Sequence, residues 1–328
     1  MFGKIHDQQI SDESLETNYK LVYNATMARD QDKLLDDAVK WHRDRLSHTW
    51  TLRIGGTPPA TELSASEAVV ALQNFMETWQ QYWEAIELVE GVLMYTERAT
   101  DKNLRNIFME VFLDSVQQDR HASPIPNRHQ TVLELLTSIA FSHIYGPQLD
   151  ADSYLAIQDL VGSCFRVLDE LCATSQNADA KHAWFKQLID GVYLEPVRKH
   201  YAREAAALAS TSSVLTYCET ARRWLMEEEC RCHTILPRHM REDMRSLIVE
   251  TALQPHLKDV AARNRDELMS LNTTASSLEV SVVYEILSMV WGKEFSGEAT
   301  ENHPPSTEKM VEAMQDLVLQ GDWVLIMP

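Results

Sequence analysis

The sequence predicts an all-α fold, built as serial helices joined by short loops. Turn-forming residues are rare, because the 328 residues include only 10 glycines and 11 prolines. No run of β-branched residues is flanked by Gly or Asn turns, and the nearest, Val280 to Val283, lies inside a helix-like pattern. Apolar residues recur instead at steps of three and four, which is the spacing of one helical face. A chain of this length favours two or three domains or repeats.

The same spacing predicts the helices in order along the chain. Each predicted helix has an apolar stripe and is bounded by polar, Gly or Pro residues. The expected helices cover residues 14–27, 31–48, 64–98, 102–116, 130–144, 151–174, 179–209, 212–234, 238–253, 255–271, 277–291 and 307–320. The expected loops cover 51–63, with its Gly-Gly and Pro-Pro pairs, 117–129, with SPIP, and 296–306.

The longest predicted helix carries the clearest pattern. Its apolar residues fall at alternating steps of four and three, so they form one stripe. The stripe consists of Phe75, Trp79, Tyr82, Ile86, Val89 and Leu93. We expect these side chains to be core, with Trp79, Tyr82 and Trp83 as the hub of a helical bundle.

Charge and cysteine content restrict the class of partner. The net charge is −19, whereas a phosphate-backbone binder needs a basic face, so we expect neither nucleic acid nor an anionic membrane as the main partner. The N-terminus lacks the apolar segment of a signal peptide, and no apolar run approaches membrane-spanning length. Five cysteines without a secretory signal favour reduced thiols. The expected location is cytoplasmic, nuclear or both.

Little in the sequence predicts chemistry. Glu227, Glu228 and Glu229 are consecutive, so on a helix they point about 100° apart and favour a solvated face over a metal site. The group of Cys230, Cys232, His233 and His239 lacks the spacing of a zinc knuckle. No phosphate loop, dinucleotide motif, zincin motif or nucleophile elbow occurs. We therefore expect no catalytic residues, metal or cofactor.

Five segments, taken in order, resemble the amino-terminal half of cullins, the scaffolds of multi-subunit ubiquitin ligases. They span about residues 15 to 320. The segments are NYKLVYNATM with the KLLDDAVKWHRDRL after it, TWQQYWEAIELVEGVLMYTER, YLEPVRKHYAREAAAL, SVLTYCETARRWLMEEECRCHTIL and LEVSVVYEILSMV. The segments VLMYTER and FMEVFLDSV are most similar to the cullin-3 type, which engages BTB-domain adaptors.

The resemblance implies an elongated stack of cullin-type helical-bundle repeats. It places the first, adaptor-facing repeat at 12–122, the second at 126–254 and a partial third at 255–328. It implies a non-catalytic scaffold arm that binds a BTB-type adaptor through the opening helix and the helix near 102–116. The implied adaptor-binding residues are Leu15, Glu16, Tyr19, Tyr23, Arg105 and Met109.

The sequence also departs from the family pattern. Arg105 stands where the cullin-3 type has an aromatic residue, and FSHIYGPQLD replaces an E-R-x-G-E element. The carboxy-terminal half, which docks the RING-box subunit and carries the neddylated lysine, is absent from the sequence. We therefore expect no RING-box subunit to bind this chain, and an adaptor-sequestering truncated paralogue is one alternative reading. Two others are a tethering subunit of the exocyst type and an all-α enzyme with an unrecognised pocket.

Overall fold

The computed structural model has the all-α fold that the sequence predicts. It describes residues 12–55, 57–58, 62–118, 121–122, 129–145, 149–174, 178–264, 266–268, 270, 276–291, 309–311 and 314. Within these residues the only strands are the two-residue β1 (His121–Ala122) and β2 (His129–Gln130), an antiparallel pair of which β1 lies inside the predicted 117–129 loop and β2 begins at its last residue. None of the helices in this part of the chain is long and apolar enough to cross a bilayer.

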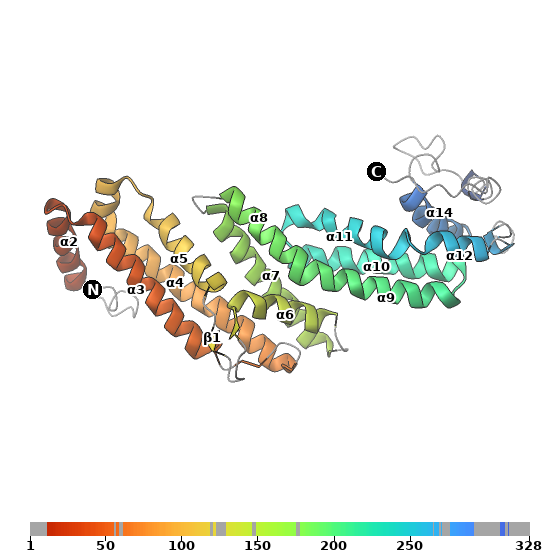
Figure 1. The fold of residues 1–328 in the computed structure, drawn as a ribbon, viewed down its shortest axis with the longest axis horizontal. Coiled ribbons are helices and arrows are strands. Elements are labelled where there is room, and N and C mark those ends of the chain that lie inside the picture. The colour runs from red at the N-terminus through yellow and green to blue at the C-terminus, as the bar shows by residue number, and fades with distance from the viewer. Residues whose placement is uncertain are drawn as a thin grey trace. The chain divides into compact units, whose positions relative to one another are not determined.

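The chain divides into two compact units, Met1–Tyr193 and Leu194–Pro328. The three repeats at 12–122, 126–254 and 255–328 are a different division, because the second repeat extends across the boundary between the two units, and they stay a prediction. The first unit holds α2 (Asp12–Met27), α3 (Gln31–Arg53), α4 (Ala65–Thr100), α5 (Leu104–Gln118), α6 (Val132–Ile144), α7 (Ala151–Thr174), α8 (Ala178–Leu188) and all but the last residue of the π-helical η1 (Ile189–Leu194). Figure 1 shows α3, α4 and α5 side by side.

The long helix α4 is fixed at both ends by local chemistry. At its start the Ser64 hydroxyl accepts from the Glu67 amide while the Glu67 carboxylate accepts from the Ser64 amide, a reciprocal capping box. At its end Asp101 adopts a left-handed conformation, with φ 54°, that stops the helix. The turn that follows sends α5 back along α4.

The core of the first unit is an aromatic cluster centred on Phe112 of α5. Its ring centroid lies 5.7 Å from that of Trp50, 5.2 Å from that of Tyr82 and 4.9 Å from that of Trp79. Burial raises the pKa of Tyr82, whose hydroxyl donates to the Phe108 carbonyl at 2.8 Å. The cluster therefore joins α3, α4 and α5 into one body.

The predicted stripe of α4 is largely confirmed. Its members Phe75, Tyr82, Ile86, Val89 and Leu93 are all at most 1% exposed. The expected hub is partly wrong, because Trp79 and Trp83 are only half-buried. Phe112 and Trp50, which come from the neighbouring helices, take the central place instead.

The second unit is also helical throughout its described residues. It holds α9 (Glu195–Thr211), α10 (Val214–Ile235), the 3-10 helix η2 (Arg238–Met240), α11 (Arg241–Ile248), the π-helical η3 (Val249–Leu253), α12 (Leu257–Arg263) and α14 (Ser277–Trp291). Tyr217 anchors α10 by donating its hydroxyl hydrogen to the Ala252 carbonyl of η3. Most of the helix expected at 307–320 lies outside the described residues, although Met310, Val311 and Met314 pack into the core of this unit.

Candidate functional site

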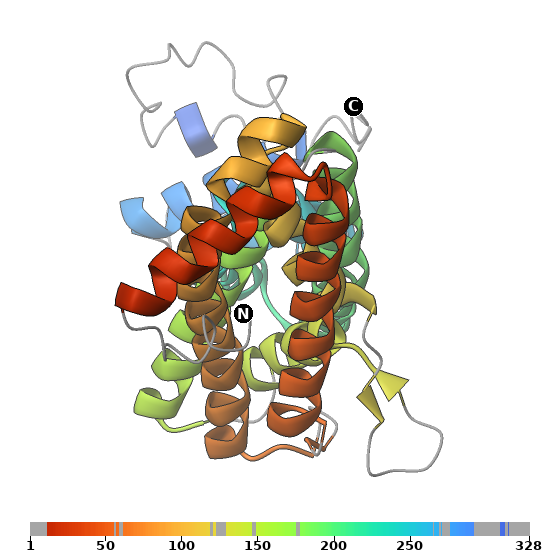
Figure 2. The same ribbon diagram turned by 90° about the vertical axis from the view of Figure 1, so that its left-hand side faces the viewer.

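The opening helix α2 lies across α4 at one end of the first unit (Figure 2). Val22 of α2 is 1% exposed and forms the buried side of the helix. The Tyr19 hydroxyl approaches Gly91 of α4, where the position of a Cβ would be 3.6 Å away. The ring of Tyr23 packs edge-on against Tyr95 of α4, with centroids 5.4 Å apart. These contacts fix which side of α2 faces outward.

Four exposed side chains of α2 form a surface that we call the α2 stripe, of which Tyr23 also contacts α4: Glu16, Lys20, Tyr23 and Met27. Steps of four, three and four place these side chains on one face of the helix. Tyr23 is 47% exposed and Met27 is 68% exposed. Glu16 and Lys20 form an exposed ion pair at 2.6 Å, and the Lys20 ammonium lowers the pKa of Glu16. Such a surface pair contributes little to stability, so both charges are available to a partner.

Arg105 of α5 is held in place by residues of α4. Its guanidinium donates to both carboxylate oxygens of Glu90, at 2.8 and 2.9 Å, and lies 5.0 Å from the centroid of the Trp83 ring. The hydrogen bond that Arg105 donates to Glu90 raises the pKa of Arg105 above its ordinary value. A bidentate pair with ring stacking gives the side chain one preferred position. Arg105 keeps 45% of its side chain exposed and can still present its charge outward.

Met109 does not fit the expectation of a direct adaptor contact. It is 1% exposed, and its sulfur accepts a hydrogen bond from the Thr174 hydroxyl of α7 at 3.0 Å. Its side chain therefore supports α5 from inside the unit. Leu15 falls within α2, but its side chain lies outside the described residues.

The remaining predicted residues come together around α4. Tyr19 lies over Gly91 and Arg105 binds Glu90, so two consecutive residues of α4 receive contacts from α2 and α5. Consecutive helix residues point about 100° apart, so the two contacts lie at the same height on adjoining faces of α4. Sequence reasoning missed Met27, although its position four residues after Tyr23 on the same stripe could have revealed it.

The described residues show no metal centre. No group of three or more His, Cys, Asp and Glu side chains among them is placed to hold a metal ion. Cys230 is exposed whereas Cys232 is buried, where burial raises its pKa to about 12, and the side chain of His239 lies outside the described residues. Glu228 turns inward to accept from Tyr201 and Arg231, and Glu227 and Glu229 face solvent. The divergence expected for three consecutive glutamates is confirmed, but the expected solvated face is wrong for Glu228, which is 1% exposed.

Comparison with known proteins identifies the family. The family model described as the cullin alpha solenoid domain matches residues 1–314 of the chain. No curated protein matches the chain. The match covers nearly the whole length, and the serial helices of both units agree with an α-solenoid scaffold. This chain belongs to the cullin family.

Proposed function

We propose that this chain is a non-catalytic scaffold arm that binds a BTB-type adaptor of a ubiquitin ligase through the α2 stripe and the neighbouring Arg105. The observation that carries the proposal is the pair of exposed side chains Tyr23 and Met27 on a helix that packs onto α4, with Val22 buried and the edge of the Tyr23 ring held against Tyr95. Tyr, Met and Arg are enriched in protein interfaces. The surface is therefore of a type that another protein can cover.

The rigidity of the supporting bundle favours the same role. A scaffold arm has to hold its partner at a set distance, so the interface has to be fixed to the core. Tyr23 reaches α4 through Tyr95, while Arg105 is fixed by Glu90 and Trp83. Little side-chain freedom would be lost when a partner binds, which favours affinity. Met109 supports α5 in this proposal and makes no contact with the adaptor.

Binding of purified BTB-domain proteins to variants of the full chain tests the proposal. Tyr23→Ala and Met27→Ala each remove an exposed apolar side chain from the α2 stripe. We expect each to weaken binding by roughly tenfold or more, as is common when an interface anchor is truncated. The matched control is Leu155→Ala on α7, where a side chain of the same unit is 56% exposed but lies outside the stripe. We expect the control to bind like the unchanged chain.

Two charge variants distinguish long-range electrostatic attraction of the adaptor from direct contact with it. Glu16→Lys changes a rim charge and should alter the association rate more than the dissociation rate. Arg105→Lys removes the bidentate geometry and should accelerate dissociation. Circular dichroism of each variant checks that the fold is kept. The proposal fails if the folded chain binds no BTB protein, or if Tyr23→Ala and Leu155→Ala have equal effects.

Three further parts of the proposal concern the setting of the scaffold. The chain contributes no catalytic group and acts by bringing other proteins together. The RING-box subunit is not expected to bind these residues, which a binding assay with that subunit alone can check. We place the chain in the cytoplasm, the nucleus or both, and imaging of a tagged chain tests this.

A further inference from the structure

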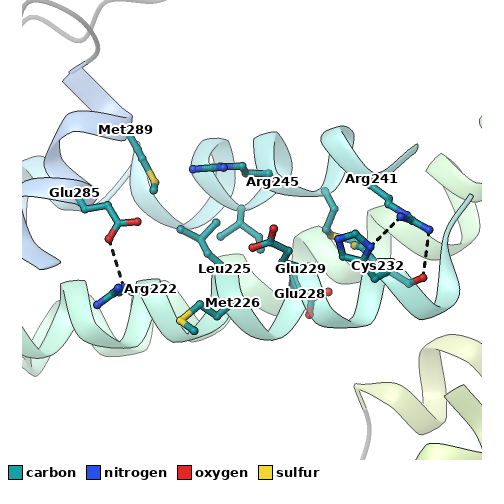
Figure 3. Close-up of a pocket in the computed structure, with 13 residues that line it drawn as sticks. Arg222, Leu225, Met226, Glu228, Glu229, Cys232, Arg241, Arg245, Glu285 and Met289 are labelled. Carbon is teal, nitrogen blue, oxygen red and sulfur yellow. Dashed lines mark hydrogen bonds and ion pairs between the residues drawn. The ribbon is translucent and has the colours of Figure 1, made fainter. Parts of the chain in front are cut away.

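The second unit contains a groove between α10, α11 and the end of α14 (Figure 3). Its volume is about 440 Å³. On α10 its lining extends from Arg222 to His233, which at 1.5 Å per residue is roughly 17 Å, or three helical turns. The groove lies entirely in the second unit, whereas the α2 stripe belongs to the first. The proposed function does not use the groove.

The floor of the groove is apolar and deformable. Met244 and Ile248 of α11 form its buried side, and Leu225 of α10 and Met289 of α14 are partly buried against the core. Met226 stands at the edge with 58% of its surface exposed. Methionine side chains adapt to irregular apolar surfaces, which is why they are common where helices are bound.

The two sides of the groove differ in charge. Arg241 and Arg245 of α11 are one turn apart on the same side. Arg241 donates to the His233 ring and to the carbonyls of His233 and Leu236. None of these acceptors is a carboxylate, so they do not neutralise the charge of Arg241. Among the side chains that the structure describes, which do not include that of Glu242, no carboxylate lies within 4.0 Å of either arginine, although Arg222 pairs with Glu285 at 3.4 Å at the far end. The α11 side is thus cationic in a chain with a net charge of −19.

We propose that this groove binds an amphipathic helix of a partner protein, with carboxylates on the edge of that helix that faces α11. A groove of three turns with an apolar floor matches the apolar stripe of a helix, whose anchors recur at three- and four-residue steps. Arg245 provides the charge that selects the acidic edge, while Glu229 on α10 disfavours acid on the opposite edge. The occupant is therefore defined by chemistry and by orientation.

A display library tests the inference with the full chain as bait. The library peptides are roughly 16 residues long, enough for three turns. Apolar residues are fixed at helical spacing, and both edges are randomised between Glu and Lys. We expect enrichment of peptides with Glu over Lys on one edge, by roughly threefold or more, as for a partly exposed ion pair. Arg245→Glu should reverse that preference, and Met226→Asp should abolish the enrichment.

The controls separate the groove from general charge effects. Arg203→Glu makes the same charge change on α9 outside the groove, where the arginine side chain is 76% exposed, and should leave the preference unchanged. Enrichment that survives Met226→Asp, or an edge preference that Arg245→Glu does not reverse, would overturn the inference. Light scattering provides a second readout: a dimer that Met226→Asp dissolves would assign the groove to a second copy of the chain and also overturn it. None of these outcomes depends on BTB binding, so this inference and the proposed function fail separately.

Discussion

A buried hydrogen bond between α3 and α5 offers a quantitative test of how the first unit is held together. The indole Nε1 of Trp50 donates to the Ser115 hydroxyl at 3.0 Å, and that hydroxyl donates to the Phe112 carbonyl at 2.7 Å. Trp50 is 0% exposed and Ser115 is 3% exposed. Water therefore cannot replace either partner without opening the core.

The size of the effect follows from which group is left without a partner. Ser115→Ala leaves the Trp50 N–H buried with no acceptor, which should lower the free energy of unfolding by about 1–3 kcal/mol. Trp50→Phe loses the same hydrogen bond and also removes ring volume, for a cost of about 2 kcal/mol or more. In the double variant no N–H is left to desolvate. Its cost should fall short of the sum by roughly 1 kcal/mol.

Urea unfolding of the four chains measures this cycle. Circular dichroism follows the whole chain, and amide hydrogen exchange in α3 and α5 reports on the first unit alone, because two units need not unfold together. Ser163→Ala on α7 is the control. The hydrogen bonds of the Ser163 hydroxyl with Asp159 and Arg166 are exposed to solvent, so their loss should change stability by less than about 0.5 kcal/mol. Equal effects of Ser115→Ala and Ser163→Ala, or additivity in the cycle, would refute the reasoning.

Three further predictions concern single residues. Cys230 is the one exposed cysteine of the five, so a thiol reagent should label one site in the native chain, none after Cys230→Ser, and all five in the unfolded, unchanged chain. Gly91→Ala should stabilise by about 0.4–1 kcal/mol in thermal unfolding, because the new methyl meets only the Tyr19 hydroxyl at an ordinary contact distance; a lower melting temperature would contradict this. Burial lowers the pKa of His200, so the unfolded state binds its proton more readily. Stability should therefore fall as the pH drops below about 6.5, and His200→Asn should weaken that dependence.

Helix positions were predictable because they depend on the recurrence of apolar residues at steps of three and four, which can be read directly from the sequence. The predicted helix at 151–174 matches α7 residue for residue, and the stripe of α4 is buried as expected. The helix expected at 179–209 is instead divided by the π-helical η1 before α9. Pro196 in the first turn of α9 was the available sign, since proline lacks an N–H and suits a helix start.

The residues that needed tertiary information were predicted less well. Met109 and Tyr23 are both apolar residues on amphipathic helices, but α7 covers Met109 while Tyr23 remains exposed. No local pattern distinguishes them, because the choice depends on which helix packs against each face. The place of Phe112 at the centre of the core has the same origin. Arg105 was expected to contact a partner protein. Its ion pair with Glu90 could not be predicted in the same way, because Glu90 lies 15 residues earlier in the sequence and on another helix.

Site-specific photocrosslinking tests the central claim most directly. A photoreactive phenylalanine analogue replaces Tyr23 in one full chain and Leu155 in another, and each is irradiated with a BTB-domain protein that binds the unchanged chain. Both positions carry exposed side chains of the first unit, but only position 23 belongs to the α2 stripe. The comparison therefore reports whether the α2 stripe is the interface. The account predicts a crosslink to the adaptor from position 23 and none from position 155. A stable complex that crosslinks from position 155 alone, or from neither position, would contradict it.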